Sequence, residues 1–342
     1  MLPLEGITVV SLEHAIAAPF ATRQLADLGA RVIKVERPLV GDFARSYDQR
    51  VNGLASHFVW ANRSKESLTL DLKQSGAANI LHQLLTEADV LVQNLAPGAA
   101  ARMGLSYTDL QTINPRLIVC NVSGYGEGGP YQNRKAYDLL IQAEAGFIST
   151  TGTTDSPSKA GISIADIAAG MYAYSNILAA LIQRGISGQG YNIDVSMLEA
   201  MTEWMGFPLY YAYDGAAPPN RAGASHATIF PYGPFVAGDG NTVLFGLQNE
   251  REWTAFCKLV LQKPALVEDP RFTTNSLRVK NKKELTDCIV PGFSHLSAMQ
   301  VIERLESAGI ANSQMRDMAD VWTHPQLEHR KRWRQINTSA GL

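Results

Sequence analysis

The sequence predicts an α/β protein with a doubly wound parallel sheet in its first half and a smaller α+β region after it. Three observations support this fold class. Strand-like and helical segments alternate over the first half of the chain. The composition shifts over residues 214–223, which are rich in Gly, Ala and Pro and indicate a linker. Beyond the linker, strand-like segments come first and amphipathic helices follow.

The chain opens with a β-α-β unit, with strands predicted at 7–12 and 31–36 and a helix at 19–28 between them. A proline in the first helical turn and a glycine after the last one are typical of helix ends. Strands joined by such a crossover pair in parallel. The glycine fingerprint of dinucleotide-binding proteins is absent from residues 13–18, so we interpret Glu36 as a solvated strand end rather than a ribose ligand.

The alternation continues through the rest of the first half. We predict further strands at 68–73, 89–94, 117–122 and 191–196. We predict helices at 75–87, around Arg102 and Met103, at 167–182 and at 197–212, the last of them bent at Pro208. The third of these helices is the most apolar, but polar residues interrupt it and it is short for a membrane span. We therefore expect it to be a buried helix.

The second region is predicted to contain two strands, several helices and a polar connection. The strands are expected at 230–236 and 242–247, and the helices at 250–261, 283–289 and 298–308. Residues 265–282 hold many polar side chains and are expected to form a surface connection. Residues 333–338 resemble the start of another strand.

The composition describes an ordinary globular protein of two or three domains, with 342 residues of which 46% are hydrophobic and 18% charged. A formal net charge of −2 gives no sign of a nucleic-acid partner. The N-terminus lacks the basic and apolar segments of a signal peptide. The three cysteines, Cys120, Cys257 and Cys288, show no metal-ligand or redox spacing. We expect buried thiols in a reducing compartment and no bound metal.

The segment 137–146 has the strongest chemical interest. Asp138 precedes an apolar helical pattern, so its carboxylate can cap that helix. The same position also suits a carboxylate nucleophile at a positive helix end. The glycine-rich segment 123–130 lies just before it and matches an isolated G-x-G-x-x-G pattern, but a proline follows and no acid ends the next strand. We interpret it as a flexible loop beside a site.

Nearly the whole chain resembles the class III coenzyme A transferases of the CaiB/BaiF type, a family that also includes formyl-CoA transferase, carnitine CoA-transferase and α-methylacyl-CoA racemase. The most recognisable match is the segment from Ala26 to Pro38. Further matches follow in the family's order: Leu4 to Val10, Gly41-Asp42, Asn62 to Lys65, Leu70 to Lys73, Asn94 with Pro97-Gly98, Arg102 to Leu105, Tyr137-Asp138 with Gln142-Ala143 and Gly146, and Asp166 with Gly170.

This resemblance implies that Asp138 is the nucleophile of a CoA transfer. In the family this carboxylate attacks the donor thioester and forms a mixed anhydride, which the released CoA thiolate converts to an aspartyl-CoA thioester. The acceptor acid then takes the CoA. Amide donors must stabilise the tetrahedral oxyanions, and we expect the loop Gly124 to Gly129 to supply them.

The resemblance also implies the residues that contact coenzyme A. Arg and Lys suit its phosphates, and small residues suit close backbone approach. By position these contacts are Ala15, Ile16, Ala17, Arg37, Leu70, Lys73, Asn94, Leu95, Ala99, Arg102, Met103 and Tyr137.

The chain is similar to members that act on short dicarboxylates such as citramalate, mesaconate or itaconate with succinyl-CoA. We therefore expect a short, dicarboxylic acceptor acid, whose second carboxylate His226 and Arg45 could face, although a lone His is more often structural. Residues of the glycine loop are expected beside this acid. They are Gly124, Tyr125 and Gly126.

The family fold implies a Rossmann-like large domain over 1–213, a linker over 214–226 and a small α+β domain over 227–325. Two such chains interlock as rings in a homodimer, and we expect a cytoplasmic enzyme without membrane or nucleic-acid partners. The final segment, 326–342, is expected to begin a return to the large domain that is shorter than in the family.

Two rival functions share this fold. A racemase needs a base and an acid on either side of an α-carbon, and racemase relatives carry His before the matching Asp. Here that position is Tyr137, and a phenol, with a reference pKa of about 10, is a poor base, which favours a transferase. An inactive CoA-binding member is the second rival, and a nicotinamide enzyme is a distant third.

Overall fold

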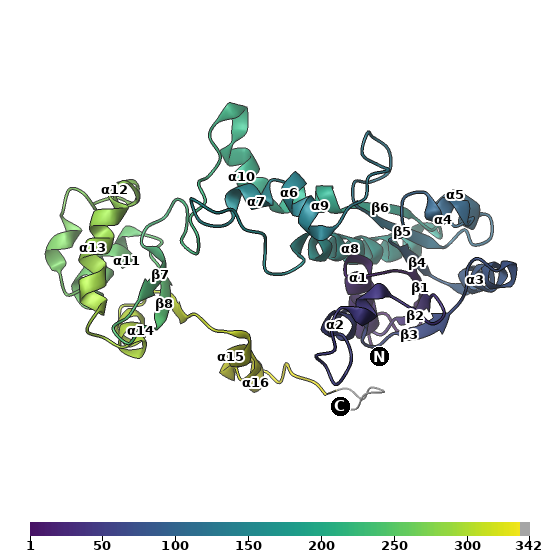
Figure 1. Cartoon of the computed structure of the whole chain (residues 1–342), viewed down its shortest axis with the longest axis horizontal. Coiled ribbons are helices and arrows are strands. Elements are labelled where there is room, and N and C mark those ends of the chain that lie inside the picture. Colours follow the sequence, from purple (N-terminus) through teal and green to yellow (C-terminus); the bar gives the residue numbers. More distant parts are fainter. Residues whose placement is uncertain (336–342) are drawn as a thin grey trace. The chain divides into compact units, whose positions relative to one another are not determined.

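The computed structural model describes residues 1–335, which divide into two compact units. The first unit consists of Met1–Thr150 and Ser158–Pro218 (Figure 1). The second consists of Thr151–Pro157 and residues 219–335. The division after Pro218 falls inside the expected linker, and Thr151–Pro157 lies in the second unit although the sequence placed it in the large domain.

The first unit is built on a six-stranded sheet in the order β3-β2-β1-β4-β5-β6, with every neighbouring pair parallel. The strands are β1 Thr8–Leu12, β2 Arg31–Glu36, β3 Glu66–Thr69, β4 Val90–Gln93, β5 Ile118–Ser123 and β6 Asn192–Ser196. This order confirms the doubly wound sheet. Its direction of winding reverses between β1 and β4, and ligands of such sheets bind at the carboxyl ends of the strands beside that reversal.

Helices surround this sheet. They are α1 Ala17–Asp27, α2 Ser56–Asn62, α3 Ser75–Glu87, α4 Ala99–Arg102, α5 Tyr107–Gln111, α6 Asp138–Glu144, α7 Phe147–Thr150, α8 Ile164–Ser187, α9 Met197–Trp204 and α10 Gly206–Tyr211, with 3₁₀ turns η1 Phe43–Ser46 and η2 Tyr213–Gly215. The helix predicted at 197–212 is broken, but at Met205 and not at Pro208. Proline is tolerated in the first turn of a helix, which is where Pro208 lies in α10.

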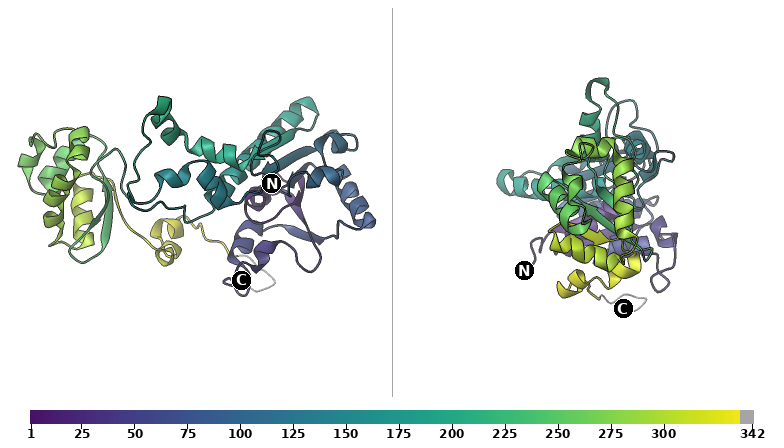
Figure 2. Two further views of the ribbon diagram at one scale, coloured as in Figure 1. Left: turned by 45° about the horizontal axis from the view of Figure 1, so that its top comes forward. Right: turned by 90° about the vertical axis from the view of Figure 1, so that its left-hand side faces the viewer.

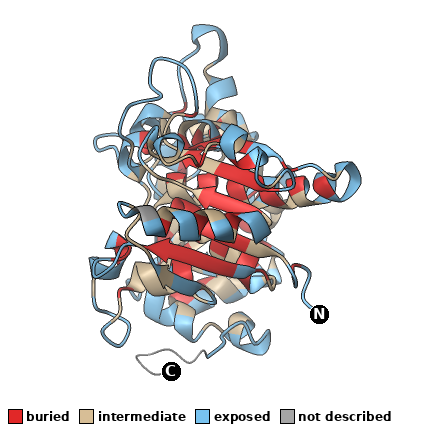
Figure 3. Cartoon of the chain, turned by 90° about the vertical axis from the view of Figure 1, so that its right-hand side faces the viewer, coloured by how far each residue is buried: buried red, intermediate tan, exposed pale blue. Residues whose placement is uncertain are grey.

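The four inner strands, β1, β2, β4 and β5, are almost wholly buried between two layers of helices, whereas the edge strand β3 is mostly exposed (Figure 3). On one face α1 and α8 pack against each other and the sheet through small residues, among them Gly170, whose added Cβ would lie 2.7 Å from the carbonyl oxygen of Ala17. On the other face leucines of α3 and α5 cover β1, β4 and β5. Among the described residues α8 alone is long and apolar enough to cross a membrane, and this packing identifies it as a core helix.

The second unit is a three-stranded antiparallel sheet in the order β7-β8-β9, with helices packed on one face (Figure 2). Its strands are β7 Tyr232–Val236, β8 Thr242–Gly246 and β9 Asn312–Gln314. Its helices are α11 Glu250–Ala255, the π-helical η3 Phe256–Val260, the 3₁₀ turn η4 Pro264–Val267, α12 Asn275–Lys280, α13 Lys282–Phe293, α14 Ala298–Ser307, α15 Met318–Trp322 and α16 Pro325–His329.

An aromatic core holds the second unit together and corrects one expectation. Phe235 and Phe245 of the sheet contact Phe293 of α13 in this core. The segment 265–282 is not only a surface connection, because it contributes η4, α12 and two fully buried side chains, Phe272 and Arg278. Of the strand predicted at 333–338, residues 333–335 are not extended into a sheet and residues 336–338 lie outside the described residues.

Candidate active site

One asparagine links the loops at the carboxyl ends of β1 and β4, where a doubly wound sheet forms its ligand crevice. Asn94 directly follows β4, and its side-chain oxygen accepts from the amide of His14 at 2.9 Å. Its side-chain nitrogen donates to the carbonyl of the same residue, also at 2.9 Å. Because His14 lies just after β1, this pair of bonds locks together the two loops that meet at the reversal of the sheet.

The next three residues form the loop assigned to coenzyme A by resemblance. Ala15 has a left-handed backbone with φ of +61°, which is unusual for a residue other than glycine. Ile16 and Ala17 are buried and lead into α1, whose first turn has no side-chain cap. Backbone groups and the uncapped end of α1 are therefore available at this edge of the sheet.

Asp138 is the first residue of α6, but its carboxylate accepts hydrogen bonds from the first turn of a different helix, α8. Oδ1 accepts from the amides of Ala165 at 2.8 Å and Asp166 at 3.3 Å, in the first turn of α8. Oδ2 accepts from Nε2 of Gln142 at 2.6 Å. Interpreting Asp138 as the cap of its own helix is therefore wrong, because the cap residue of α6 is Tyr137 and no side chain caps that helix.

Groups of positive polarity surround the Asp138 carboxylate. Two amide donors and the positive end of a 24-residue helix lie against one carboxylate oxygen. Gln142, which holds the other oxygen, is completely buried and accepts from the amide of Ala160 at 2.9 Å. The carboxylate thus has a fixed position while remaining partly open to solvent.

Asp166 is a second carboxyl group beside the first. Burial, together with the negative charge of Asp138, raises the pKa of Asp166 to about 7. The site therefore places a carboxylate that is held by two amides beside a carboxyl group that keeps its proton up to about neutral pH. Within residues 1–335, no three His, Cys, Asp or Glu side chains gather as metal ligands would.

The glycine loop contacts the segment just before Asp138, and three of its amides already have acceptors. The amides of Gly126, Glu127 and Gly128 donate to Ser123, Asp194 and Gln132, respectively, at 2.8–3.0 Å. A Cβ on Gly124 would overlap the Cβ of Ala136, so this glycine lets the loop approach the segment before Asp138. The loop thus packs beside the site, and the amides that donate to the Asp138 carboxylate come from α8 instead.

Three of the other predicted CoA residues lie at one edge of the sheet. Arg37, Leu70 and Asn94 each directly follow a strand, β2, β3 and β4, and the carboxyl ends of parallel strands share an edge. Arg37, Lys73 and Arg102 are exposed cations, as phosphate contacts require. Tyr137 is exposed, whereas the remaining positions are half-buried. These are Leu70, Asn94, Leu95, Ala99 and Met103.

Glu36 is not a solvated strand end, as the sequence suggested, but is 3% exposed. It accepts from Arg45 at 2.6 and 3.0 Å, from Ser67 at 2.6 Å and from the amide of Asp42 at 2.9 Å. Burial alone would raise the pKa of Glu36, but these hydrogen bonds lower it to about 2. Arg45, a predicted substrate residue, is therefore paired with a buried carboxylate.

Sequence reasoning missed the charged side chains beneath the crevice. Glu13, Lys34, Asp42 and Lys65 are buried together there. The available signal was the pattern of β2, where Lys34 and Glu36 interrupt an otherwise apolar strand. A buried parallel strand accommodates such residues only when they find charged partners.

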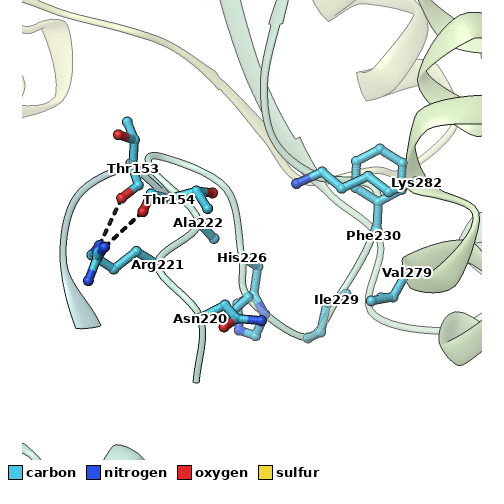
Figure 4. Close-up of a pocket in the computed structure, with 12 residues that line it drawn as sticks. Thr153, Thr154, Asn220, Arg221, Ala222, His226, Ile229, Phe230, Val279 and Lys282 are labelled. Atoms are coloured by element: carbon cyan, nitrogen blue, oxygen red, sulfur yellow. Dashed lines mark hydrogen bonds between the residues drawn. The ribbon is translucent and has the colours of Figure 1, made fainter. Parts of the chain in front are cut away.

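His226 lies in the second unit, at a cavity of about 320 Å³ formed by that unit alone (Figure 4). Its ring stacks on Tyr232, and its Nδ1 accepts from the amide of Thr228 at 3.1 Å, which leaves Nε2 as the donor. Arg221 donates to the carbonyls of Thr153 and Thr154 at 2.8 Å.

The cavity has a basic lining. Arg221, His226 and Lys282 line it, and its lining includes no Asp or Glu. Arg45, the other residue expected at a second carboxylate, belongs to the first unit.

Comparisons with known proteins agree with this geometry. The model of CoA-transferase family III matches residues 4–341. The chain is 36% identical to the succinyl-CoA:glutarate CoA-transferase of Mus musculus over 331 residues, which cover 96% of this chain and 76% of the relative. It is 34% identical to the acetyl-CoA:oxalate CoA-transferase of Acetobacter aceti over 330 residues, which cover 96% of this chain and 84% of the relative.

A solved structure shows the same fold. The crystal structure of a CaiB/BaiF family protein from Brucella suis superimposes with a TM-score of 0.85 at 33% identity, covering 96% of this chain and 88% of that one.

Proposed function

The chain belongs to CoA-transferase family III and is a class III CoA-transferase of acyl-CoA metabolism, and we propose that Asp138 is the residue that carries CoA during the transfer. The carboxylate attacks the carbonyl carbon of the donor acyl-CoA, the carbon–sulfur bond breaks, and CoA leaves as the thiolate. The product on the enzyme is a mixed anhydride. The thiolate then attacks the Asp138 carbon of that anhydride and releases the donor acid as its carboxylate.

The aspartyl-CoA thioester formed in this way passes CoA to the acceptor. The acceptor carboxylate attacks the thioester carbon and expels the thiolate, and the thiolate then attacks the acyl carbon of the new anhydride. Asp138 leaves as the free carboxylate, and the acceptor leaves as its CoA thioester. No water, metal or redox partner enters the balance of these steps.

The observation that carries this proposal is the pair of α8 amides on Oδ1 of Asp138. In two of the steps the Asp138 carbon itself is attacked, so that Oδ1 becomes the tetrahedral oxyanion. The amides of Ala165 and Asp166 already point at this atom, and donors fixed in advance are effective for oxyanions because no reorganisation is needed.

Replacing Asp138 by Asn tests the proposal. An amide is a poor nucleophile, so we expect CoA transfer to fall by roughly 10³-fold or more. Wild-type enzyme incubated with succinyl-CoA and then hydroxylamine should carry a hydroxamate at Asp138, detected by mass spectrometry. Glu144→Gln is the matched control, since Glu144 is an exposed carboxylate of the same helix. Transfer that persists in Asp138→Asn would contradict the role of Asp138.

We also propose a short dicarboxylic acid as acceptor, with succinyl-CoA as a donor. The relatives named above act on glutarate and oxalate. The cavity of the second unit has a basic lining that suits a carboxylate. His226 and Lys282 are the donors that we assign to that carboxylate.

Substitutions at the cavity test the acid class. Lys282→Met should raise KM for glutarate by about tenfold and leave KM for butyrate unchanged, because only the diacid keeps a second charge. Lys280→Met is the control, since this exposed lysine does not line the cavity. If monocarboxylates are used as well as dicarboxylates and His226→Ala has no effect, the proposed acid class is wrong.

A homodimer in the cytoplasm completes the proposal. Its support is the exposure of large apolar side chains in the first unit, with Ile182 70% and Ile186 86% exposed on α8. The reducing compartment is supported by cysteines that are free throughout the described part of the chain. Light scattering after size-exclusion chromatography should give twice the chain mass of 37.2 kDa, whereas a monomer mass would refute the dimer.

A further inference from the structure

Four buried charged side chains form a neutral network beneath the loop that follows β1. Lys65 donates to Glu13 at 2.7 Å, and Lys34 donates to Asp42 at 2.6 Å. Each of these side chains is at most 2% exposed. Asn62 of α2 links the two pairs, because its oxygen accepts from Lys34 at 2.7 Å and from Lys65 at 3.1 Å.

Asp42 is the member of this network that reaches the loop. Its Oδ2 receives Lys34, while its Oδ1 accepts from the amide of Ala15 at 3.1 Å and from the amide of Ala44 at 2.9 Å. Ala15 is the residue with the left-handed backbone. For an alanine this conformation is unfavourable by itself, so a contact from outside the loop must hold it.

The neighbouring residues are held in the same way by side chains from other elements. Glu13 is bonded to Lys65 and, at 2.8 Å, to the hydroxyl of Thr22 in α1. His14 is bonded twice to Asn94. Three successive residues are thus each fixed by a different part of the first unit, and the fixed segment opens directly into Ile16 and Ala17.

We propose that Asp42, oriented by Lys34, is a positioning residue that holds the left-handed turn at Ala15 and thereby sets the shape of the CoA-binding loop. The inference rests on the proposed function, because the loop is assigned to CoA there. Asp42 acts through the backbone of Ala15 and does not itself touch the substrate. Charged residues suit this task because both oxygens of one carboxylate are used, one for the lysine and one for the two amides.

Asparagine at position 42 tests the geometry sharply. It has one acceptor oxygen, so it can satisfy either Lys34 or the amides of Ala15 and Ala44, but not both. We expect Asp42→Asn to raise KM for acyl-CoA and Kd for CoA about tenfold, with kcat changed by less than about threefold. Titration calorimetry with CoA measures Kd without turnover.

The double variant Lys34→Met with Asp42→Asn should recover the CoA binding that Asp42→Asn loses. Without the lysine, the asparagine oxygen is free to turn toward the amides, and no uncompensated charge remains at this pair. We expect Kd for CoA to return to within about threefold of the wild-type value. A role in stability alone does not predict that removing a second buried side chain restores binding.

Asp89→Asn is the matched control at the opposite end of β1. Asp89 also pairs with a cation, Arg184 at 2.8 Å, and also accepts from a backbone amide, that of Thr8 at 2.8 Å. We expect this variant to lower the melting temperature without changing Kd for CoA. An unchanged Kd in Asp42→Asn, an equal rise in Asp89→Asn, or no rescue in the double variant would overturn the inference.

Failure of this inference differs from failure of the proposed function. Wild-type protein that does not bind CoA, or Asp138→Asn that still transfers CoA, would refute the proposed function. Normal CoA binding by Asp42→Asn in a chain whose transfer depends on Asp138 would refute only the role of Asp42.

Discussion

Gly170 sits where α8 crosses α1, and replacing it with alanine tests how closely the two helices must approach. An added Cβ would lie 2.7 Å from the carbonyl oxygen of Ala17 and 2.9 Å from Cδ1 of Phe20. Real Cβ atoms do not come so near backbone oxygens, so one helix must shift. Alanine in a helix interior gains about 1 kcal/mol over glycine, whereas overpacking a core costs about 1–3 kcal/mol.

Gly185 offers the matched control, because it lies in the same helix and nothing comes within 4 Å of its added Cβ. Gly185→Ala keeps the helical gain without the overlap. The difference in unfolding free energy between the two variants should therefore equal the steric cost, about 1–3 kcal/mol in favour of Gly185→Ala. For a unit of this size each kcal/mol corresponds to about 2–4 °C in melting temperature.

Scanning calorimetry of both variants measures this difference. Because the carbonyl that must move belongs to Ala17, KM for acyl-CoA should also rise in Gly170→Ala and not in Gly185→Ala. Equal melting temperatures for the two variants would refute the reasoning, since they would show that the crossing has room for a methyl group.

Two further predictions concern titrating groups. Because burial and the charge of Asp138 raise the pKa of Asp166 from 3.8 to about 7, the folded protein holds this proton more tightly than the unfolded chain, and stability should fall as pH rises through that interval. Asp166→Asn should reduce the difference between urea midpoints at pH 5 and pH 8, and an identical difference in both proteins would contradict the assignment. Burial raises the pKa values of Cys120 and Cys257 to about 12, so Ellman's reagent should modify only the half-buried Cys288 in the native protein and all three thiols in guanidinium. Rapid modification of more than one native thiol would show that one of these two sites opens.

The sequence predicts the elements of the first unit well where the signal is local. β2 has the predicted bounds because an apolar, β-branched run lies between a glycine and a proline. α3 likewise spans the predicted residues 75–87. Local periodicity failed at 265–282, where Phe272 and Arg278 are single buried side chains among polar neighbours and no repeat reveals them.

In the candidate site, too, local sequence patterns did not reveal contacts between residues far apart in the chain. The resemblance identified Asp138, but the local pattern assigned its carboxylate to α6. The amides that donate to its Oδ1 begin 27 residues later, in the first turn of α8, and only the packing of the two helices brings them to Asp138. The interpretation of Glu36 as a solvated strand end was wrong for a similar reason, because the residues that bond and bury it lie in η1 and β3.

The cap that Asp138 provides to α8 has a consequence for the proposed cycle. Whenever Asp138 carries an acyl group or CoA it is neutral, so the first turn of α8 loses its counter-charge until the product leaves. Asp166 then feels burial but no longer the neighbouring anion, and its proton is held less tightly. Hydrogen exchange at the amides of Ala165 and Asp166 would accordingly follow the covalent state of the enzyme, with the start of one core helix loosening and tightening once in every turnover.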